Sequence, residues 1–266
     1  MSLYDWVSDS MVDEGERRGA VRVGWLLTEK KGAVLYDAPE RIRSADMNRE
    51  HAKSASRCPA VINMESRYFL IKCPFTMHLG FERGKDGKPR LTNRLGEKSP
   101  VRSNKLAQLV TLVAEPEWRY KDRPTLQIKT PYLFLADEPV YITQTAPFMH
   151  YLRQPWPGTL FGGRFPIHVW PRPLMWAFEW HDTSKDLILR RGDPWFYAGF
   201  ETLPADRPIS VVEAEMTPEL DDYTQAISSA VNYAGQTFSL FKCAEKRRPR
   251  TLLIPVVRET VADAPY

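Results

Sequence analysis

Apolar and polar residues alternate along much of this chain with the two-residue period that is typical of β-strands. The clearest case is the stretch 173–180, where Trp176, Phe178 and Trp180 fall on one face of a strand. Glu179 falls on the other face. Further stretches of strand length are separated by turns with proline or glycine; they cover residues 21–27, 32–36, 59–64, 67–72, 75–82, 125–130, 132–135, 140–145, 186–190, 195–197 and 209–215. The pattern predicts a mainly β protein of the α+β class, with an antiparallel β-sandwich or jelly-roll-like core.

A helical pattern replaces the alternation near the C-terminus. Thr217 is in the N-cap position, Pro218 follows at the first helical position, and acidic residues occupy the first turn. An apolar stripe then recurs at helical spacing, through Leu220, Tyr223, Ile227, Val231, Ala234, Phe238 and Phe241. These features predict one long helix over residues 217–245 that lies across the core, followed by a terminal strand or extended segment from residue 251.

The same patterns divide the chain into three parts. Residues 1–20 are polar and form an N-terminal arm, and residues 21–216 form the β-rich core. Residues 217–266 supply the helix and the terminal strand that pack on the core. The 266-residue chain is long enough for a sizeable hydrophobic core.

Charge and cysteine content narrow the function classes. The net charge is +4, and the basic residues are too scattered for a nucleic-acid surface. The one basic cluster, residues 246–250, is interpreted as a solvated link after the helix. Three cysteines without a CxxC pair favour a reducing compartment. We see neither a signal peptide nor an apolar run long enough to cross a membrane, so we expect a soluble, cytoplasmic protein.

Several short motifs in residues 57–201 resemble those of a family of uncharacterised β-rich proteins from bacteriophages and bacteria. The motifs are Cys58-Pro59, Tyr68-x-x-Ile71, Pro131-Tyr-Leu-Phe, Pro147, Pro157, Trp170-x-Arg-Pro, Phe178, Trp180 and Arg191-Gly-Asp-Pro194. They mark turns, strand entries and core aromatics. The resemblance implies a β-rich fold and carries no activity with it.

Aromatic and guanidinium side chains are concentrated between residues 147 and 201. Trp and Arg together offer stacking and bidentate contacts to a planar, anionic or carbohydrate ligand. We therefore predict a Trp/Arg surface that binds a ligand, formed by Arg153, Trp156, Trp170, Arg172 and Trp195. The loop 147–165 would carry part of it, unless that loop only caps the sandwich.

A metal site is the alternative hypothesis. Glu179 and His181 share a strand face, and His168 precedes them by one predicted turn. Two histidines and a carboxylate are the ligands of a non-haem Fe(II) site, which would make the protein a cupin-like oxygenase. The simpler interpretation is that Glu179 and His181 face solvent opposite the buried tryptophans.

Other catalytic motifs are missing from the sequence. It contains no Gly-x-Ser-x-Gly elbow and no phosphate-binding loop. We therefore favour a non-catalytic binding or assembly role with a small molecule or a protein as partner, and we do not expect nucleic acid or membrane as partners. The oxygenase remains the alternative, and the sequence predicts no oligomeric state.

Overall fold

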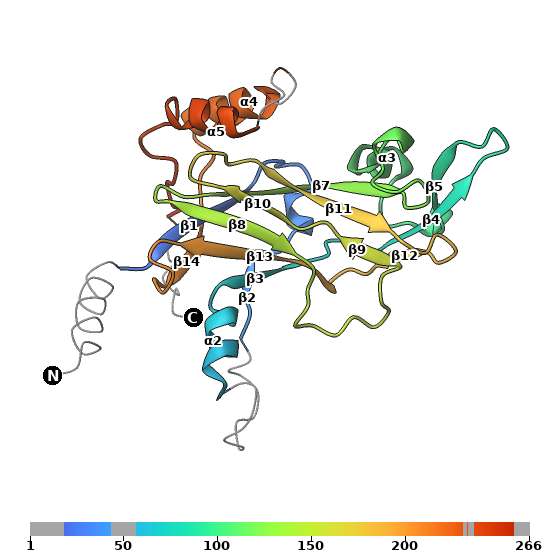
Figure 1. The fold of residues 1–266 in the computed structure, drawn as a ribbon, viewed down its shortest axis with the longest axis horizontal. Helices are drawn as coiled ribbons and strands as arrows, with labels where there is room; N and C mark the ends of the chain where they lie inside the picture. The colour runs from blue at the N-terminus through green and yellow to red at the C-terminus, as the bar shows by residue number, and fades with distance from the viewer. Residues whose placement is uncertain (1–18, 44–56, 231–232, 234–236, 258–266) are drawn as a thin grey trace, which may run out of the picture.

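The computed structural model describes residues 19–43, 57–230, 233 and 237–257 (Figure 1). Within these residues the strands form three sheets. The six-stranded sheet contains β14 (Ile209–Glu213), β1 (Val21–Leu27), β7 (Thr125–Leu135), β11 (Pro173–Trp180) and β9 (Gly158–Leu160) in that order, with β6 (Val110–Leu112) beside β7. The five-stranded sheet has the order β10 (Gly163–Pro166), β8 (Val140–Thr145), β13 (Pro194–Thr202), β3 (Tyr68–Lys72) and β2 (Glu40–Arg41). The smallest sheet joins β12 (Leu187–Leu189), β4 (Met77–Arg83) and β5 (Pro89–Asn93).

The prediction of a mainly β fold is confirmed. Among the named strands, every pairing is antiparallel except that of β1 with β14, which is parallel. Sheets of six, five and three strands in the described chain differ from the two four-stranded sheets of a jelly roll.

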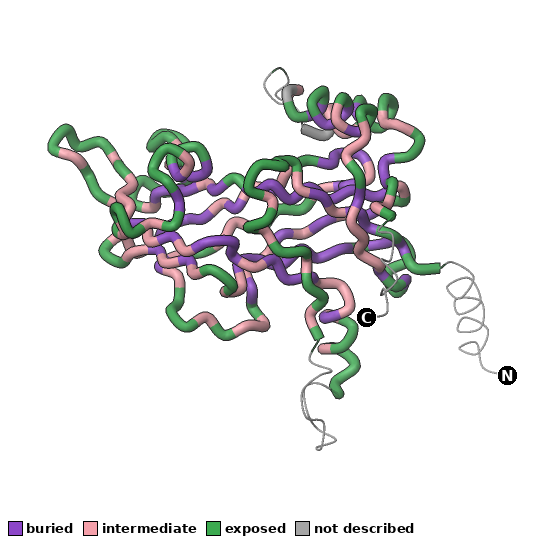
Figure 2. The backbone as a smooth tube through the Cα atoms, turned by 180° about the vertical axis from the view of Figure 1, so that it is seen from behind, coloured by how far each residue is buried: buried purple, intermediate pink, exposed green. Residues whose placement is uncertain are grey.

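The main core lies between the six-stranded and five-stranded sheets. Trp176, Phe178 and Trp180 are fully buried there, as their alternation predicts. Aromatic rings from the two sheets meet directly: the ring centroids of Trp176 and Trp195 are 6.2 Å apart, and those of Phe134 and Phe200 are 5.4 Å apart. Figure 2 shows the buried residues concentrated along these strands, whereas the helices and loops outside them are mostly exposed.

A second core lies on the outer face of the six-stranded sheet, under α4 (Pro218–Ala230) and α5 (Thr237–Glu245). The Tyr223 hydroxyl of α4 donates to Val169 O (2.7 Å) and contacts Ala244 O of α5 (3.1 Å). In one straight helix, residues 223 and 244 would be roughly 30 Å apart. The prediction of a single long helix is therefore wrong: two shorter helices lie side by side and turn their apolar faces to the same core (Figure 1).

The segment after α5 is extended. Glu215 N donates to Ile254 O (2.8 Å) and Val256 N donates to Glu213 O (2.9 Å), so this segment pairs with the end of β14. The predicted extended segment at the C-terminus is present as far as residue 257. Residues 258–266, and residues 1–18 of the predicted arm, lie outside the described residues.

Two shorter helices complete the framework. α2 (Pro59–Glu65) occupies a stretch that we predicted as a strand, and it begins with proline at its first turn. α3 (Ser103–Leu109) buries Leu106 and Leu109 and leads directly into β6. Figure 1 shows α3 and the α4–α5 pair on the same side of the six-stranded sheet. In the described part of the chain, no helix has both the length and the apolar character that a membrane span requires.

Candidate functional site

The predicted Trp/Arg surface is not formed, because two of its tryptophans are core residues. Trp170 is 4% exposed and packs against Phe241 of α5, with ring centroids 5.4 Å apart. Trp195 is 1% exposed and lies in the other core, beside Trp176 and Phe196. A ligand on the surface would touch neither ring.

The loop between β8 and β9 holds the next two predicted residues. Trp156 is half-buried and stands edge-on to Trp176, at 5.5 Å between ring centroids. The crevice lined by Arg153 and Trp156 has a volume of about 10 Å³, which is no more than one water requires. Trp156 packs on the core, whereas Arg153 is exposed, and only Arg172 of the five predicted residues lines a large cavity.

The predicted metal ligands are not assembled either. His181 Nε2 lies 2.8 Å from Glu179 Oε1, at the end of β11 that pairs with Thr125. His168 lies near Val140, beyond the other end of β11, so the length of that strand, roughly 20 Å, separates it from the pair. Burial is the main cause that lowers the pKa of His168. No group of three or more His, Cys, Asp or Glu suited to a metal ion occurs among the residues described. The three residues predicted to bind Fe(II) therefore do not form a common site.

The simpler interpretation, that Glu179 faces solvent, is also wrong, because its side chain is buried. Its side chain is 5% exposed and lies 3.6 Å from Arg123 Nη1. The Thr159 hydroxyl is 3.3 Å from His181 Nε2, the same nitrogen that faces Glu179. A nucleophilic triad requires the base to use different ring nitrogens for the hydroxyl and the carboxylate. The cluster therefore does not form a hydrolytic relay.

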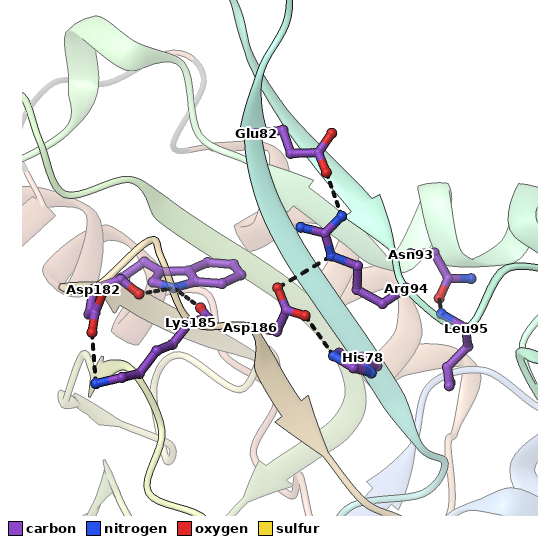
Figure 3. A network of polar contacts seen from close by, with 9 residues as sticks. His78, Glu82, Asn93, Arg94, Leu95, Asp182, Lys185 and Asp186 are labelled. Carbon is purple, nitrogen blue, oxygen red and sulfur yellow. Dashed lines mark hydrogen bonds and ion pairs between the residues drawn. The ribbon is translucent and has the colours of Figure 1, made fainter.

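A polar network ties the small sheet together (Figure 3). Asp186 accepts from His78 Nε2 (2.8 Å) and Arg94 Nε (3.3 Å), and Arg94 also pairs with Glu82. Hydrogen bonds to the Ser184 hydroxyl and to Lys185 lower the pKa of Asp182 to about 2. The contacts of Asp186 with His78 and Arg94 hold the start of β12 against β4 and the end of β5.

A largely apolar pocket lies elsewhere, between the segment after β1, the β3–β4 turn and α3. We call it the α3 pocket; its volume is about 320 Å³, at the lower end of the range for small-molecule sites. Its wall is mostly apolar and is formed by Leu35, Tyr36, Pro74, Phe75, Val101 and Leu109. Phe75, Val101 and Leu109 are buried, whereas Leu35 remains 42% exposed at the mouth.

The rim of the α3 pocket is cationic. Lys31, Arg102 and Arg191 line it with exposed side chains. The one acidic residue in the lining, Glu29, already pairs with Lys105 at 2.6 Å. Burial, with a smaller contribution from the Glu29 carboxylate, raises the pKa of Tyr36 to about 12, so this phenol adds no negative charge at neutral pH. Among the described residues, the rim therefore carries more positive than negative charge above an apolar floor.

Two glycine turns lie next to two of these cations, Lys31 and Arg191. Gly32 (φ 80°) lets the chain enter the short 3-10 helix η1 (Ala33–Leu35), which brings Leu35 to the mouth. Gly192 (φ 81°) follows Arg191, and its N–H donates to Cys73 O (2.9 Å). Arg191 N is 3.2 Å from the Thr76 hydroxyl, which fixes the turn against the pocket wall. Left-handed backbone of this kind favours glycine.

Comparison with protein-family models and with curated proteins gave no match for the chain. The resemblance to phage and bacterial β-rich proteins therefore stays a prediction. The sequence does not predict the α3 pocket, because its lining residues come from four separate segments of the chain. The available sign was a basic residue directly before a glycine, at Lys31 and at Arg191, which we treated as ordinary turns.

Proposed function

We propose that the protein binds a small amphipathic organic anion in the α3 pocket, with the apolar part of the ligand against Phe75, Val101 and Leu109. The observation that carries the proposal is the excess of cations over one already paired carboxylate at the rim of an apolar pocket. A carboxylate, sulfate or phosphate ester at the mouth would receive charge-assisted hydrogen bonds from Arg102 and Arg191.

The apolar part of the ligand supplies most of the binding free energy. Leu35 is exposed at the mouth without a ligand, and an alkyl or aryl group would remove it from water. This proposal keeps the favoured class of a non-catalytic binding protein with a small-molecule partner. It moves the site from the Trp/Arg surface to the α3 pocket.

Calorimetric titration with decanoate tests the proposal. At roughly 0.4 kcal/mol per non-hydrogen atom, decanoate should bind at one site with a Kd of about 0.3 mM. Decyltrimethylammonium is the matched control, because it has the same alkyl chain and the opposite charge. We expect it to bind at least tenfold more weakly. Equal affinity for the two ions, or no binding of decanoate, would refute the proposal.

A further inference from the structure

A second cavity continues from the α3 pocket along the outer face of the six-stranded sheet. We call it the β7–β11 groove; it has a volume of about 570 Å³ and runs between α3 and α4. Its floor comes from β7 and from the start of β11, through Pro131, Pro173, Leu174 and Met175. The two cavities share the lining residues Glu29, Lys105 and Leu109, so they meet at the side of α3.

The groove carries its own cations. Lys129 and Arg172 are exposed and line it, and neither forms an ion pair with a described residue. Lys129 lies on β7 directly opposite Met175 of β11, and Arg172 immediately precedes β11. The positive charge therefore lies beside apolar surface here as well. Glu29 is the one acidic residue in this lining, and it is the same carboxylate that pairs with Lys105.

The Glu29–Lys105 ion pair marks the junction between the cavities. Its side chains are 45% and 42% exposed, and the pair links the segment after β1 to α3. An exposed pair of this kind contributes little stability and can reorganise when a ligand arrives. A chain that passes beside it would have one end at Arg102 and Arg191, and the other end at Lys129 and Arg172.

We infer that the ligand is an elongated molecule with an anionic group at each end and an apolar middle, of which the α,ω-dicarboxylates are the simplest examples. The inference rests on the proposed function, because it extends the same site. It also predicts that a dicarboxylate of suitable length binds more tightly than the monocarboxylate of equal length, which a single cationic pocket would not produce. A second carboxylate costs desolvation if it ends on apolar surface, and it gains affinity only where cations meet it.

Affinities for linear dicarboxylates from octanedioate to hexadecanedioate, measured by calorimetry beside the monocarboxylates of equal length, test the inference. We expect one intermediate length to bind about tenfold more tightly than its monocarboxylate. The Lys129→Gln/Arg172→Gln variant should bind that dicarboxylate no more tightly than the monocarboxylate, while its affinity for decanoate stays unchanged. The single variant Arg172→Gln should lose part of the gain. Lys121→Gln/Arg250→Gln is the matched control, since both side chains are exposed and line neither cavity.

The outcomes separate the two claims. If decanoate binds in the α3 pocket but every dicarboxylate binds more weakly than its monocarboxylate, the elongated dianion is refuted and the proposed function stands. A dicarboxylate preference that survives in the Lys129→Gln/Arg172→Gln variant would also overturn the inference. If neither series binds, both claims fail. Loss of the preference in that variant alone, with the Lys121→Gln/Arg250→Gln control unchanged, supports the inference.

Discussion

Replacing Trp176 by alanine should destabilise the protein by about 3–5 kcal/mol, which is a large part of the stability of an ordinary domain. Trp176 is fully buried and stacks on Phe178, with ring centroids 5.3 Å apart and planes 8° from parallel. It also contacts Trp195 of the opposite sheet and Trp156 of the loop between β8 and β9. Alanine would leave a cavity at the centre of all three contacts. We expect the melting temperature to fall by about 10 °C.

Two control variants make this result specific. Trp176→Phe keeps an aromatic ring and removes an indole N–H that has no hydrogen-bond partner among the described residues, so it should cost less than half as much. Tyr151 lies in the loop between β8 and β9, and its side chain is 88% exposed. Tyr151→Ala should therefore change the free energy of unfolding by less than about 0.5 kcal/mol. Denaturant midpoints of all three variants provide the measurement. A Trp176→Ala midpoint equal to that of Tyr151→Ala would contradict the described core.

Neutralising the rim of the α3 pocket should have the largest effect on binding. The Arg102→Gln/Arg191→Gln variant removes two cations and keeps the apolar wall. At about 1 kcal/mol for each exposed charge-assisted contact, the affinity for decanoate should fall about thirtyfold. Calorimetry of the variant and the wild type measures the change.

Charge specificity and stability serve as controls for that variant. Decyltrimethylammonium should bind the variant no more weakly than the wild type, because repulsion by the guanidinium groups is gone. Both arginines are exposed, so the melting temperature should stay within about 2 °C. An equal loss of affinity for both ions would mean that the substitutions damaged the apolar wall, and the role of the rim charge would be refuted.

The β-rich core could be predicted from the sequence because, in a strand with one buried face, apolar residues at every second position are the buried ones. Trp176, Phe178 and Trp180 follow the period of two and are all buried. The same logic failed for α2, where the apolar run from Ala60 to Ile62 resembles a strand. Pro59, however, is suited to a first helical position, and Ile62 N donates to Cys58 O as in a helical turn.

The long C-terminal helix was wrong for a different reason. An apolar stripe at helical spacing continues from Leu220 to Phe241, and spacing alone cannot show that the chain reverses. Gly235, which lies between the two helices in the sequence, was the available sign of an interruption. The hydrogen bond between Tyr223 and Ala244 depends on tertiary packing, which local periodicity does not contain.

None of the five residues predicted for a ligand site lines the α3 pocket, and only Arg172 lines the neighbouring β7–β11 groove. A tryptophan can lie on either face of a sheet, so sequence position alone did not show that Trp170 and Trp195 are core residues and not part of a surface ligand site. The alternation along β11 places Glu179 on the face predicted to be exposed, yet Arg123 and His181 cover its side chain. The α3 pocket joins segments near residues 30, 75, 101 and 191, so it exists only after the three sheets have formed.

Photolabelling tests the central claim most directly, because it shows where an amphipathic anion binds. A decanoate analogue with a diazirine in its alkyl chain would be irradiated with the protein and the modified peptides identified by mass spectrometry. We predict adducts in the segments 32–36, 74–76 and 101–109, which excess decanoate suppresses and decyltrimethylammonium does not. Adducts confined to the β8–β9 loop around Arg153 and Trp156, or adducts that decanoate does not suppress, would contradict the assignment of the α3 pocket.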